Sequence, residues 1–406
     1  MNKEIQQAIL VAGLVAVIGL LPGCGLQSNK GEAVTPLTSG ATLTVKDMAV
    51  EQSAGKVEVS QIERIENTSG MAWLSDKQVL LQQEEIRQQG KGKEPFYSHT
   101  SVIYNVDTKA KTPWEWGEGT VWLSPDGKHA FIAEAKTSKY NLSGQIINLI
   151  NGLSQAVKLE LGIVTAGWAD NNTLLLSVGH TVERIDIPSG NSSVISLHGG
   201  EDSSVTGKNE KENIYLVDGV RKIKRSLVEI KKHGSGSSGY GSDYSLIALY
   251  PIKDTIYYID DQFKLKSIPI KGGEPSVLAA NIIEAAPSPD GSRVALVQQI
   301  GETEMLVLAD SHGNIQGDAV ARGNLIQRLS WSPDMKVLLF SVYSEAQGGM
   351  NGLYAFDLEA GKVTALADIQ SLSYPIRWAP GSRQFMITDS ETRDGQYRTV
   401  TSIFKM

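Results

Sequence analysis

One short pattern recurs along this chain and constrains its fold more than any other feature. Each copy has a Trp or a substitute for it, then a polar turn rich in Ser, Pro, Asp and Gly, then an apolar strand. Within the turn, Ser and Asp accept backbone hydrogen bonds, Pro fixes φ, and Gly closes the turn without steric cost. Each copy therefore predicts a β-hairpin. The six clear copies begin at Trp73, Trp122, Trp168, Pro287, Trp331 and Trp378.

A second turn signal follows downstream in several copies. A strand ends in Asp, and a Gly comes three or four residues later, at Asp186–Gly190, Asp310–Gly313 and Asp357–Gly361. Two turns per copy indicate three or four strands in each repeat. Repeats of about 40 to 50 residues built from such strands are typical of a β-propeller, which makes this chain all-β.

The number of blades follows from the spacing of the repeats. Two weaker copies begin near Val205 and Leu249 and carry the strands at 213–218 and 255–260. With a spacing of about 44 residues, the chain is predicted to form eight four-stranded blades, or seven if one weak copy is an insertion. The last repeat is long enough for only three strands. We expect Val57–Ile62 to supply its outer strand, so that the two ends pair and close the ring.

The N-terminal segment has the pattern of an export signal. Residues 8–21 form an unbroken apolar run that is shorter than the roughly 20 residues needed to cross a bilayer, as in a signal peptide. Leu21-Pro22-Gly23-Cys24 follows directly and resembles a lipobox, in which a small residue precedes the cleaved bond and the cysteine thiol takes up a diacylglyceryl group. Cys24 is the only cysteine of the chain.

These features predict three segments. Residues 1–23 are a lipoprotein signal peptide, residues 24–56 are a lipid-anchored flexible tether, and residues 57–406 are the propeller. Membrane lipid attached to Cys24 would hold the protein on the extracytoplasmic face of the cell membrane.

The turns also carry a resemblance to a known family. Those at Trp122, Pro287 and Trp331 resemble the repeats of TolB-like propellers. Together with the lipobox, residues 57–406 are similar to the YqgU-type propeller lipoproteins of Gram-positive bacteria. The resemblance implies a propeller and a surface lipoprotein, and it implies no catalytic or ligand-binding residue. TolB-like propellers are often six-bladed, so six blades is a further alternative.

Motifs for catalysis or metal binding are weak. Gly234–Gly241 is the nearest approach to the Gly-x-Ser-x-Gly of serine hydrolases but does not match it, so we interpret it as a flexible loop. Asp310, Asn314 and Asp318 lack the Gly and Glu of a calcium loop, and a hairpin turn explains them better. The six histidines are scattered rather than clustered as metal ligands would be. They are His99, His129, His180, His198, His233 and His312.

Two further clusters have alternative interpretations. Arg221–Arg225, with Lys231–Lys232 after it, could face anionic lipid or a wall polymer, but an exposed edge strand protected by its lysines is the preferred interpretation. Trp114-Glu115-Trp116 could form a carbohydrate platform, but packing between blades is preferred.

Composition excludes several classes of partner. The chain has 38 Lys and Arg against 45 Asp and Glu, a formal net charge of −7, which argues against binding to nucleic acid. With Cys24 lipidated, no thiol remains for a disulfide or a metal, and no Gly-rich nucleotide loop is present, so no cofactor is predicted. A closed ring needs no partner to cover its edges, so we expect a monomer.

Three hypotheses for the function remain. The preferred one is a non-enzymatic binding or scaffold module for a peptide, a protein or an envelope polymer. The second is a propeller lyase or hydrolase whose residues converge from several blades on the central channel. The third is a sensory partner of a membrane complex.

Overall fold

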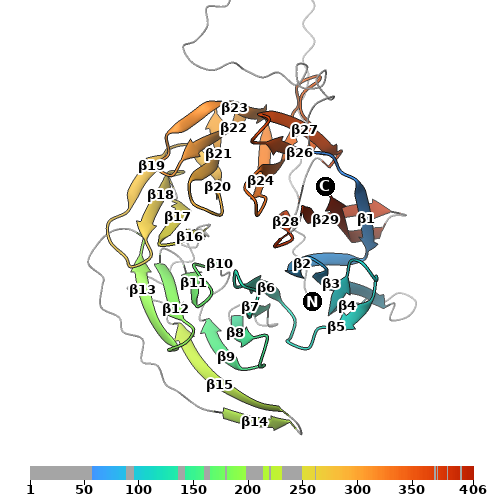
Figure 1. The fold of residues 1–406 in the computed structure, drawn as a ribbon, viewed down its shortest axis with the longest axis vertical. Helices are drawn as coiled ribbons and strands as arrows, with labels where there is room; N and C mark the ends of the chain where they lie inside the picture. The colour runs from blue at the N-terminus through green and yellow to red at the C-terminus, as the bar shows by residue number, and fades with distance from the viewer. Residues whose placement is uncertain are drawn as a thin grey trace, which may run out of the picture. The chain divides into compact units, whose positions relative to one another are not determined.

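The computed structural model describes most of the chain from Val57 onward as strands and turns. They form 30 strands and no helix, so none of the described residues belongs to a helix that could cross a membrane. Seven sheets surround one axis (Figure 1). The all-β propeller is therefore confirmed, with seven blades. The described residues are 57–87, 96–135, 142–159, 165–178, 181–197, 214–218, 221–230, 249–260, 262–369, 372, 374–381, 383–393 and 396–406.

Each of the first three blades starts at the axis and ends at the rim. Blade 1 has β2 (Thr68–Ser75), β3 (Gln78–Arg87), β4 (Phe96–Asn105) and β5 (Lys111–Pro113). Blade 2 has β6 (Thr120–Leu123), β7 (His129–Ala135), β8 (Leu142–Asn148) and β9 (Ser154–Leu159). Blade 3 has β10 (Thr165–Trp168), β11 (Thr173–Val178), β12 (Thr181–Asp186) and β13 (Asn191–Ser196).

The next three blades repeat this order. Blade 4 has β16 (Leu249–Ile252), β17 (Thr255–Ile259), β18 (Leu265–Pro269) and β19 (Ser276–Ala279). Blade 5 has β20 (Ile282–Pro287), β21 (Arg293–Ile300), β22 (Thr303–Asp310) and β23 (Ile315–Gly323). Blade 6 has β24 (Leu325–Trp331), β25 (Val337–Tyr343), β26 (Gly352–Asp357) and β27 (Lys362–Ala367).

The seventh blade joins the two ends of the described chain. It contains β28 (Arg377–Trp378), β29 (Gln384–Arg393), β30 (Gln396–Lys405) and, as its outer strand, β1 (Gln61–Glu66). β1 pairs antiparallel with β30, with Gln61 opposite Lys405 and Glu66 opposite Val400. The predicted closure is confirmed, but the strand begins at Gln61 rather than at Val57. Val57 instead lies buried in the core between blades 6 and 7.

The core is divided among the interfaces between blades. The inner strands β2, β6, β10, β16, β20, β24 and β28 each contact the next one around a closed ring. A cluster of buried apolar side chains fills each interface between neighbouring blades of the described chain. The second strand of a blade is covered on both faces, so β25 is buried without alternation up to Val342 and is apolar there except at Ser341.

The repeated turn has the same hydrogen bonds in three blades. A buried Ser donates its hydroxyl to the Asp two residues later, at 2.6 to 2.8 Å. The same Ser oxygen accepts the N–H of the first residue of the next strand, at 2.9 to 3.1 Å. This network fixes the hairpins that follow β6, β20 and β24. The equivalent triads are Ser124–Asp126–His129, Ser288–Asp290–Arg293 and Ser332–Asp334–Val337.

These turns lie at one end of the channel, and we call that side of the ring the turn face. Gln384 follows the turn after Trp378 and pairs with Lys405, which also pairs with Gln61. β1 therefore starts at the turn face.

The prediction of an eighth blade starting near Val205 is wrong, as is the six-bladed alternative. Two strands, β14 (Ile214–Asp218) and β15 (Arg221–Ile230), form a hairpin that extends the sheet of blade 2 outward. β15 pairs in parallel with β9, with Arg225 opposite Ser154 and Ile230 opposite Leu159. Strand-forming residues alone do not specify whether a strand starts a blade or joins the edge of an existing one. The weak copy at Leu249 does start a blade, since β16 is its inner strand.

Candidate functional site

Four of the repeated tryptophans gather around one part of the channel. Trp73, Trp122, Trp168 and Trp378 each lie at or near the end of an inner strand, just before its turn. These strands are β2, β6, β10 and β28, which are consecutive around the ring. The repeat therefore places four indoles together although 305 positions separate the first from the last.

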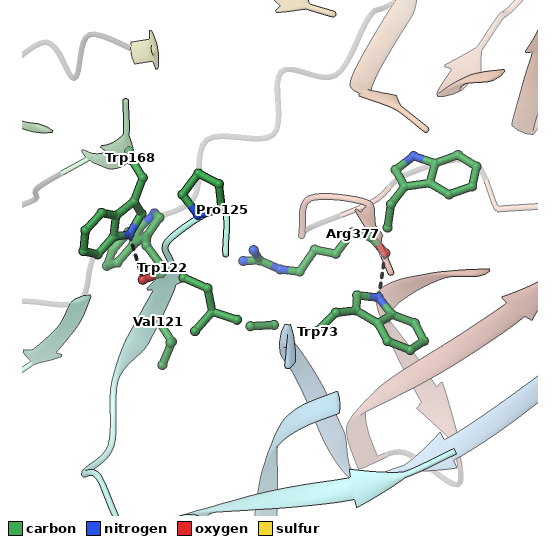
Figure 2. Close-up of a pocket in the computed structure, with 10 residues that line it drawn as sticks. Trp73, Val121, Trp122, Pro125, Trp168 and Arg377 are labelled. Atoms are coloured by element: carbon green, nitrogen blue, oxygen red, sulfur yellow. Dashed lines mark hydrogen bonds between the residues drawn. The ribbon is translucent and has the colours of Figure 1, made fainter. Parts of the chain in front are cut away.

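Hydrogen bonds between blades hold three of these four indoles in place. An indole N–H donates to a backbone carbonyl of the preceding inner strand, and two of these bonds are visible in Figure 2. Because the acceptor belongs to the neighbouring blade, each bond fixes both the ring orientation and the blade interface. The bonds in this region are Trp73 Nε1 to Arg377 O at 2.9 Å, Trp168 Nε1 to Trp122 O at 3.0 Å, and Trp378 Nε1 to Ser330 O at 3.3 Å.

The indoles line a cavity of about 400 Å³ at the turn face, which we call the tryptophan pocket. Apart from one side chain, its lining is apolar. The lining residues are Ala72, Trp73, Val121, Trp122, Leu123, Pro125, Gly167, Trp168, Arg377 and Trp378. A mostly apolar cavity of this size with a single polar group is typical of a site for a small ligand or for the end of a chain.

Arg377 is the exceptional residue of this pocket. Figure 2 shows its side chain extending from β28 across the pocket toward Trp122 and Pro125. Its Nε is buried and has no hydrogen-bond partner within the described part of the protein. Burial lowers the pKa of the guanidinium to about 10, so that Arg377 still carries its charge at neutral pH. A buried cation without a counter-ion is costly, and a bound anion would remove that cost.

The lining determines what the pocket can do chemically. Its lining residues in the described part of the chain carry no carboxylate, imidazole, hydroxyl or thiol, so these residues supply no nucleophile and no general base. It offers a cationic hydrogen-bond donor and aromatic surface. These groups are suited to binding an anionic ligand.

Sequence reasoning did not identify Arg377, although one signal was present. Aligning the repeats on their Trp position compares the residues just before it. Those residues are Ala72, Val121, Gly167, Ala286, Ser330 and Arg377. Arg377 is the one charged residue at a position that is otherwise small or apolar.

The structure places three of the six histidines. His129 stacks on Trp168 with ring centroids 6.2 Å apart, and its Nε2 lies 3.3 Å from Asn148 Nδ2. His129 is thus a neighbour of the pocket but not part of its lining. His99 is exposed on β4, and His312 is in the turn between β22 and β23. His180, His198 and His233 lie outside the described residues.

Two of the preferred interpretations are confirmed. Trp114 and Trp116 pack against the core between blades 1 and 2, as the inter-blade interpretation predicts. Asp310 accepts hydrogen bonds from the backbone N–H groups of His312 and Asn314, which makes this segment the hairpin turn that we expected.

The basic segment Arg221–Arg225 begins β15, which is not the edge strand of its sheet, because β14 lies on one side of it and β9 on the other. Among the described strands, Arg221–Lys224 pair only with β14, and the pairing with β9 begins at Arg225. Lys231–Lys232, Gly234–Gly241 and Cys24 lie outside the described residues. Within the described ranges, no group of three or more His, Cys, Asp or Glu side chains could hold a metal ion.

Comparison with known proteins gives a fold and no family. No family model and no curated protein matches this chain. Among solved structures, it is similar to the β-propeller domain of the Trilobed protease from Pyrococcus furiosus, with a TM-score of 0.50 and 14% identity over 82% of this chain and 97% of that chain. That domain has an open velcro topology, whereas here β1 pairs with β30.

Two other solved structures match less well. An uncharacterized protein from Listeria monocytogenes EGD-e has a TM-score of 0.47 and 14% identity, over 84% of this chain and 94% of that chain. TolB from Acinetobacter baumannii has a TM-score of 0.41 and 13% identity, over 79% of each chain. At 14% identity, the similarity to the Pyrococcus furiosus domain supports the propeller fold alone.

Proposed function

We propose that this chain is a non-enzymatic binding module whose ligand occupies the tryptophan pocket at the turn face. One observation carries the proposal. The Arg377 guanidinium extends into an apolar pocket, and its buried Nε has no partner in the described part of the protein. An unpaired buried donor costs roughly 1 to 3 kcal/mol, and more when it is charged, and a ligand that supplies the acceptor recovers this energy.

A propeller enzyme is the competing hypothesis from the sequence. It would need acidic, basic or nucleophilic side chains at the place where the substrate is held. Among the described residues, the lining of the tryptophan pocket brings none of these groups together. We therefore favour binding over turnover at this site.

We also propose that the protein is a lipoprotein of the YqgU type, held on the outer face of the cytoplasmic membrane through Cys24. The apolar run at 8–21 and the lipobox-like Leu21–Cys24 support this. The tether would have a root-mean-square reach of about 30 Å if it is flexible. Because β1 starts at the turn face, the tether would join the propeller on the side of the repeated turns, to which Pro125 of the pocket lining belongs.

The anchor is tested by mass spectrometry of protein extracted from membranes. We expect a mature chain that begins at Cys24 and carries a diacylglyceryl group. The Cys24→Ala variant should be neither cleaved nor lipidated, whereas Ser28→Ala should behave like the natural protein. An uncleaved or unlipidated natural chain would refute the anchor and leave the proposal for the pocket standing.

The binding role is tested by photo-crosslinking in intact cells, using the repeat as its own control. Pro125 is exposed at the rim of the pocket, and Pro289 occupies the same turn position in blade 5 but does not line the pocket. With p-benzoylphenylalanine at one of these positions at a time, we expect an adduct from position 125 and none from position 289. Arg377→Gln should abolish the adduct at position 125.

Two results would contradict this role. Equal adducts from both positions would mean that the turn face makes only nonspecific contacts. An adduct from position 125 that persists in Arg377→Gln would mean that the pocket does not hold the ligand.

A further inference from the structure

The charge of the tryptophan pocket limits the charge of its ligand. Arg377 is the one charged side chain among the lining residues. A monoanion would neutralise it, whereas a phosphate monoester with two negative charges would leave one charge unpaired in an apolar site. Burial of an unpaired charge is strongly unfavourable, so the pocket favours a group with a single negative charge.

The geometry of the Arg377 guanidinium favours one class of singly charged anion, a carboxylate. A guanidinium is a planar fork that can bind the two oxygens of a carboxylate through parallel hydrogen bonds. Approach from the Nε side uses Nε together with one terminal nitrogen, and Nε is the atom that is buried without a partner. The unused donor is therefore placed to form half of a bidentate carboxylate contact.

The indoles of the pocket indicate which chemical group of the ligand carries this carboxylate. Three of the four lining indoles already donate their N–H groups to backbone carbonyls. They have no donor left for the hydroxyls of a sugar, and they present their aromatic surfaces instead. An apolar or aromatic ligand body would pack against these surfaces.

We infer that the tryptophan pocket binds a monocarboxylate attached to an aromatic or large apolar group. This inference rests on the proposed binding role and specifies its ligand. The chemistry is found both in a free aryl-substituted acid and in the C-terminal residue of a peptide that ends in an aromatic side chain. In either ligand the carboxylate would contact Arg377 and the ring would lie among the indoles.

Isothermal titration of the full chain in detergent with paired probes tests this inference. N-acetyl-L-tryptophan carries the carboxylate, and N-acetyl-L-tryptophanamide has the same body without the charge. We expect the acid to bind about thirtyfold more tightly than the amide, since a charge-assisted bidentate pair is lost with the amide. In Arg377→Gln the two probes should bind equally weakly.

A matched variant separates the pocket from a general effect of arginine loss. Arg184, on β12 outside the pocket, also has a buried Nε with no partner among the described residues. Arg184→Gln should keep the full preference for the acid. Arg377→Lys should keep some of that preference with weaker binding, because it retains the charge without the fork. Circular dichroism on each variant checks that it is folded.

Further probes distinguish the two sources of the carboxylate. If Gly-Gly-Gly-Trp binds as well as N-acetyl-L-tryptophan and its C-terminal amide does not, the pocket takes a peptide terminus. If only the small acid binds, the ligand is a free acid. Both results support the inference.

Two results would overturn the inference. One is equal binding of acid and amide by the natural chain, and the other is tighter binding of phenyl phosphate than of N-acetyl-L-tryptophan. If the adduct at position 125 still requires Arg377, either result refutes the ligand class and leaves the binding role intact. If the adduct is also lost, the binding role fails as well.

Discussion

Replacing Trp331 by alanine is expected to lower the free energy of unfolding by about 4 kcal/mol, because a large buried side chain is lost and the interface between blades 5 and 6 is left with a cavity. Trp331 is only 7% exposed and belongs to the core between these blades. Its Nε1 donates to Ala286 O of the neighbouring inner strand at 2.7 Å. Denaturant unfolding, followed by tryptophan fluorescence and circular dichroism, measures the loss.

The contribution of the indole N–H can be separated from that of the ring. Trp331→Phe keeps an aromatic ring and removes the donor, so we expect a smaller loss of about 2 kcal/mol. Trp378→Phe is the matched comparison, because the Trp378 bond to Ser330 O is longer, at 3.3 Å, and only partly buried. Its loss should be about 1 kcal/mol or less. Equal losses at the two positions would show that the bond between blades contributes nothing beyond ring packing.

The repeat predicted the fold because the residues that form each turn lie next to one another in the sequence of each copy. The Ser–Asp turns are local, and the observed networks at Ser124, Ser288 and Ser332 use only residues within five positions. Local chemistry of this kind can be inferred from one sequence. The eighth unit was mispredicted because β14 and β15 are strands without that turn, and nothing local specifies that β15 pairs with β9.

The ring closure was predicted from the alternation of apolar residues and from the missing outer strand of the last repeat. Val57 and Val59 alternate like a strand, and pairing of the two ends was predicted from the missing outer strand. In the structure Val57 is an anchor in the core between blades 6 and 7, and the paired strand carries Ile65 as its buried residue. The predicted strand Val57–Ile62 overlaps the observed β1 only at Gln61 and Ile62, so pairing of the two ends was predicted correctly and the residues that pair were not.

The candidate site depends on relations that no single repeat contains. The tryptophan pocket combines the inner strands of four blades, so the repeated Trp residues could be recognised without showing that they share a cavity. Arg377 has no motif around it. Its importance follows from its place in the pocket lining together with a buried Nε that has no partner among the described residues, and both are properties of the folded structure.

Replacing Glu284 by alanine is the second change that should strongly destabilise the protein. The backbone of β24 is irregular between Gln327 and Ser330, and Arg328 has a φ of 62°. Glu284, on the neighbouring β20, accepts the backbone N–H groups released there, with Oε1 at 2.8 Å from Leu329 N and Oε2 at 3.1 Å from Arg328 N. Alanine would leave both donors without this acceptor, so we expect a loss of about 3 kcal/mol.

The control is an exposed glutamate of the same blade. Glu302 lies exposed in the turn between β21 and β22, and Glu302→Ala should change the free energy of unfolding by less than about 0.5 kcal/mol. A similarly small effect of Glu284→Ala would show that water replaces the carboxylate and that the irregular segment of β24 does not need it.

The pH dependence of Glu284→Gln tests the electrostatic part of the same contact. Burial raises the pKa of Glu284, the N–H groups of Leu329 and Arg328 act against this rise, and the charge of Glu304 adds to it. The folded protein therefore binds a proton here at a pH at which the unfolded chain does not. It follows that the contribution of Glu284 to stability increases as the pH falls from the raised folded-state value toward the usual value of about 4.5.

Glutamine cannot titrate, so this contribution is absent from the variant. The difference in unfolding free energy between the natural protein and Glu284→Gln should therefore grow as the pH falls through that window. Taking the difference removes the contributions of the other carboxyl groups, including those of turn residues such as Asp290, whose pKa is lowered to about 2 by Ser288 and Ser292. A difference that shrinks instead would mean that the hydrogen bonds of the ionised carboxylate outweigh its burial, and that Glu284 holds β24 chiefly through its negative charge.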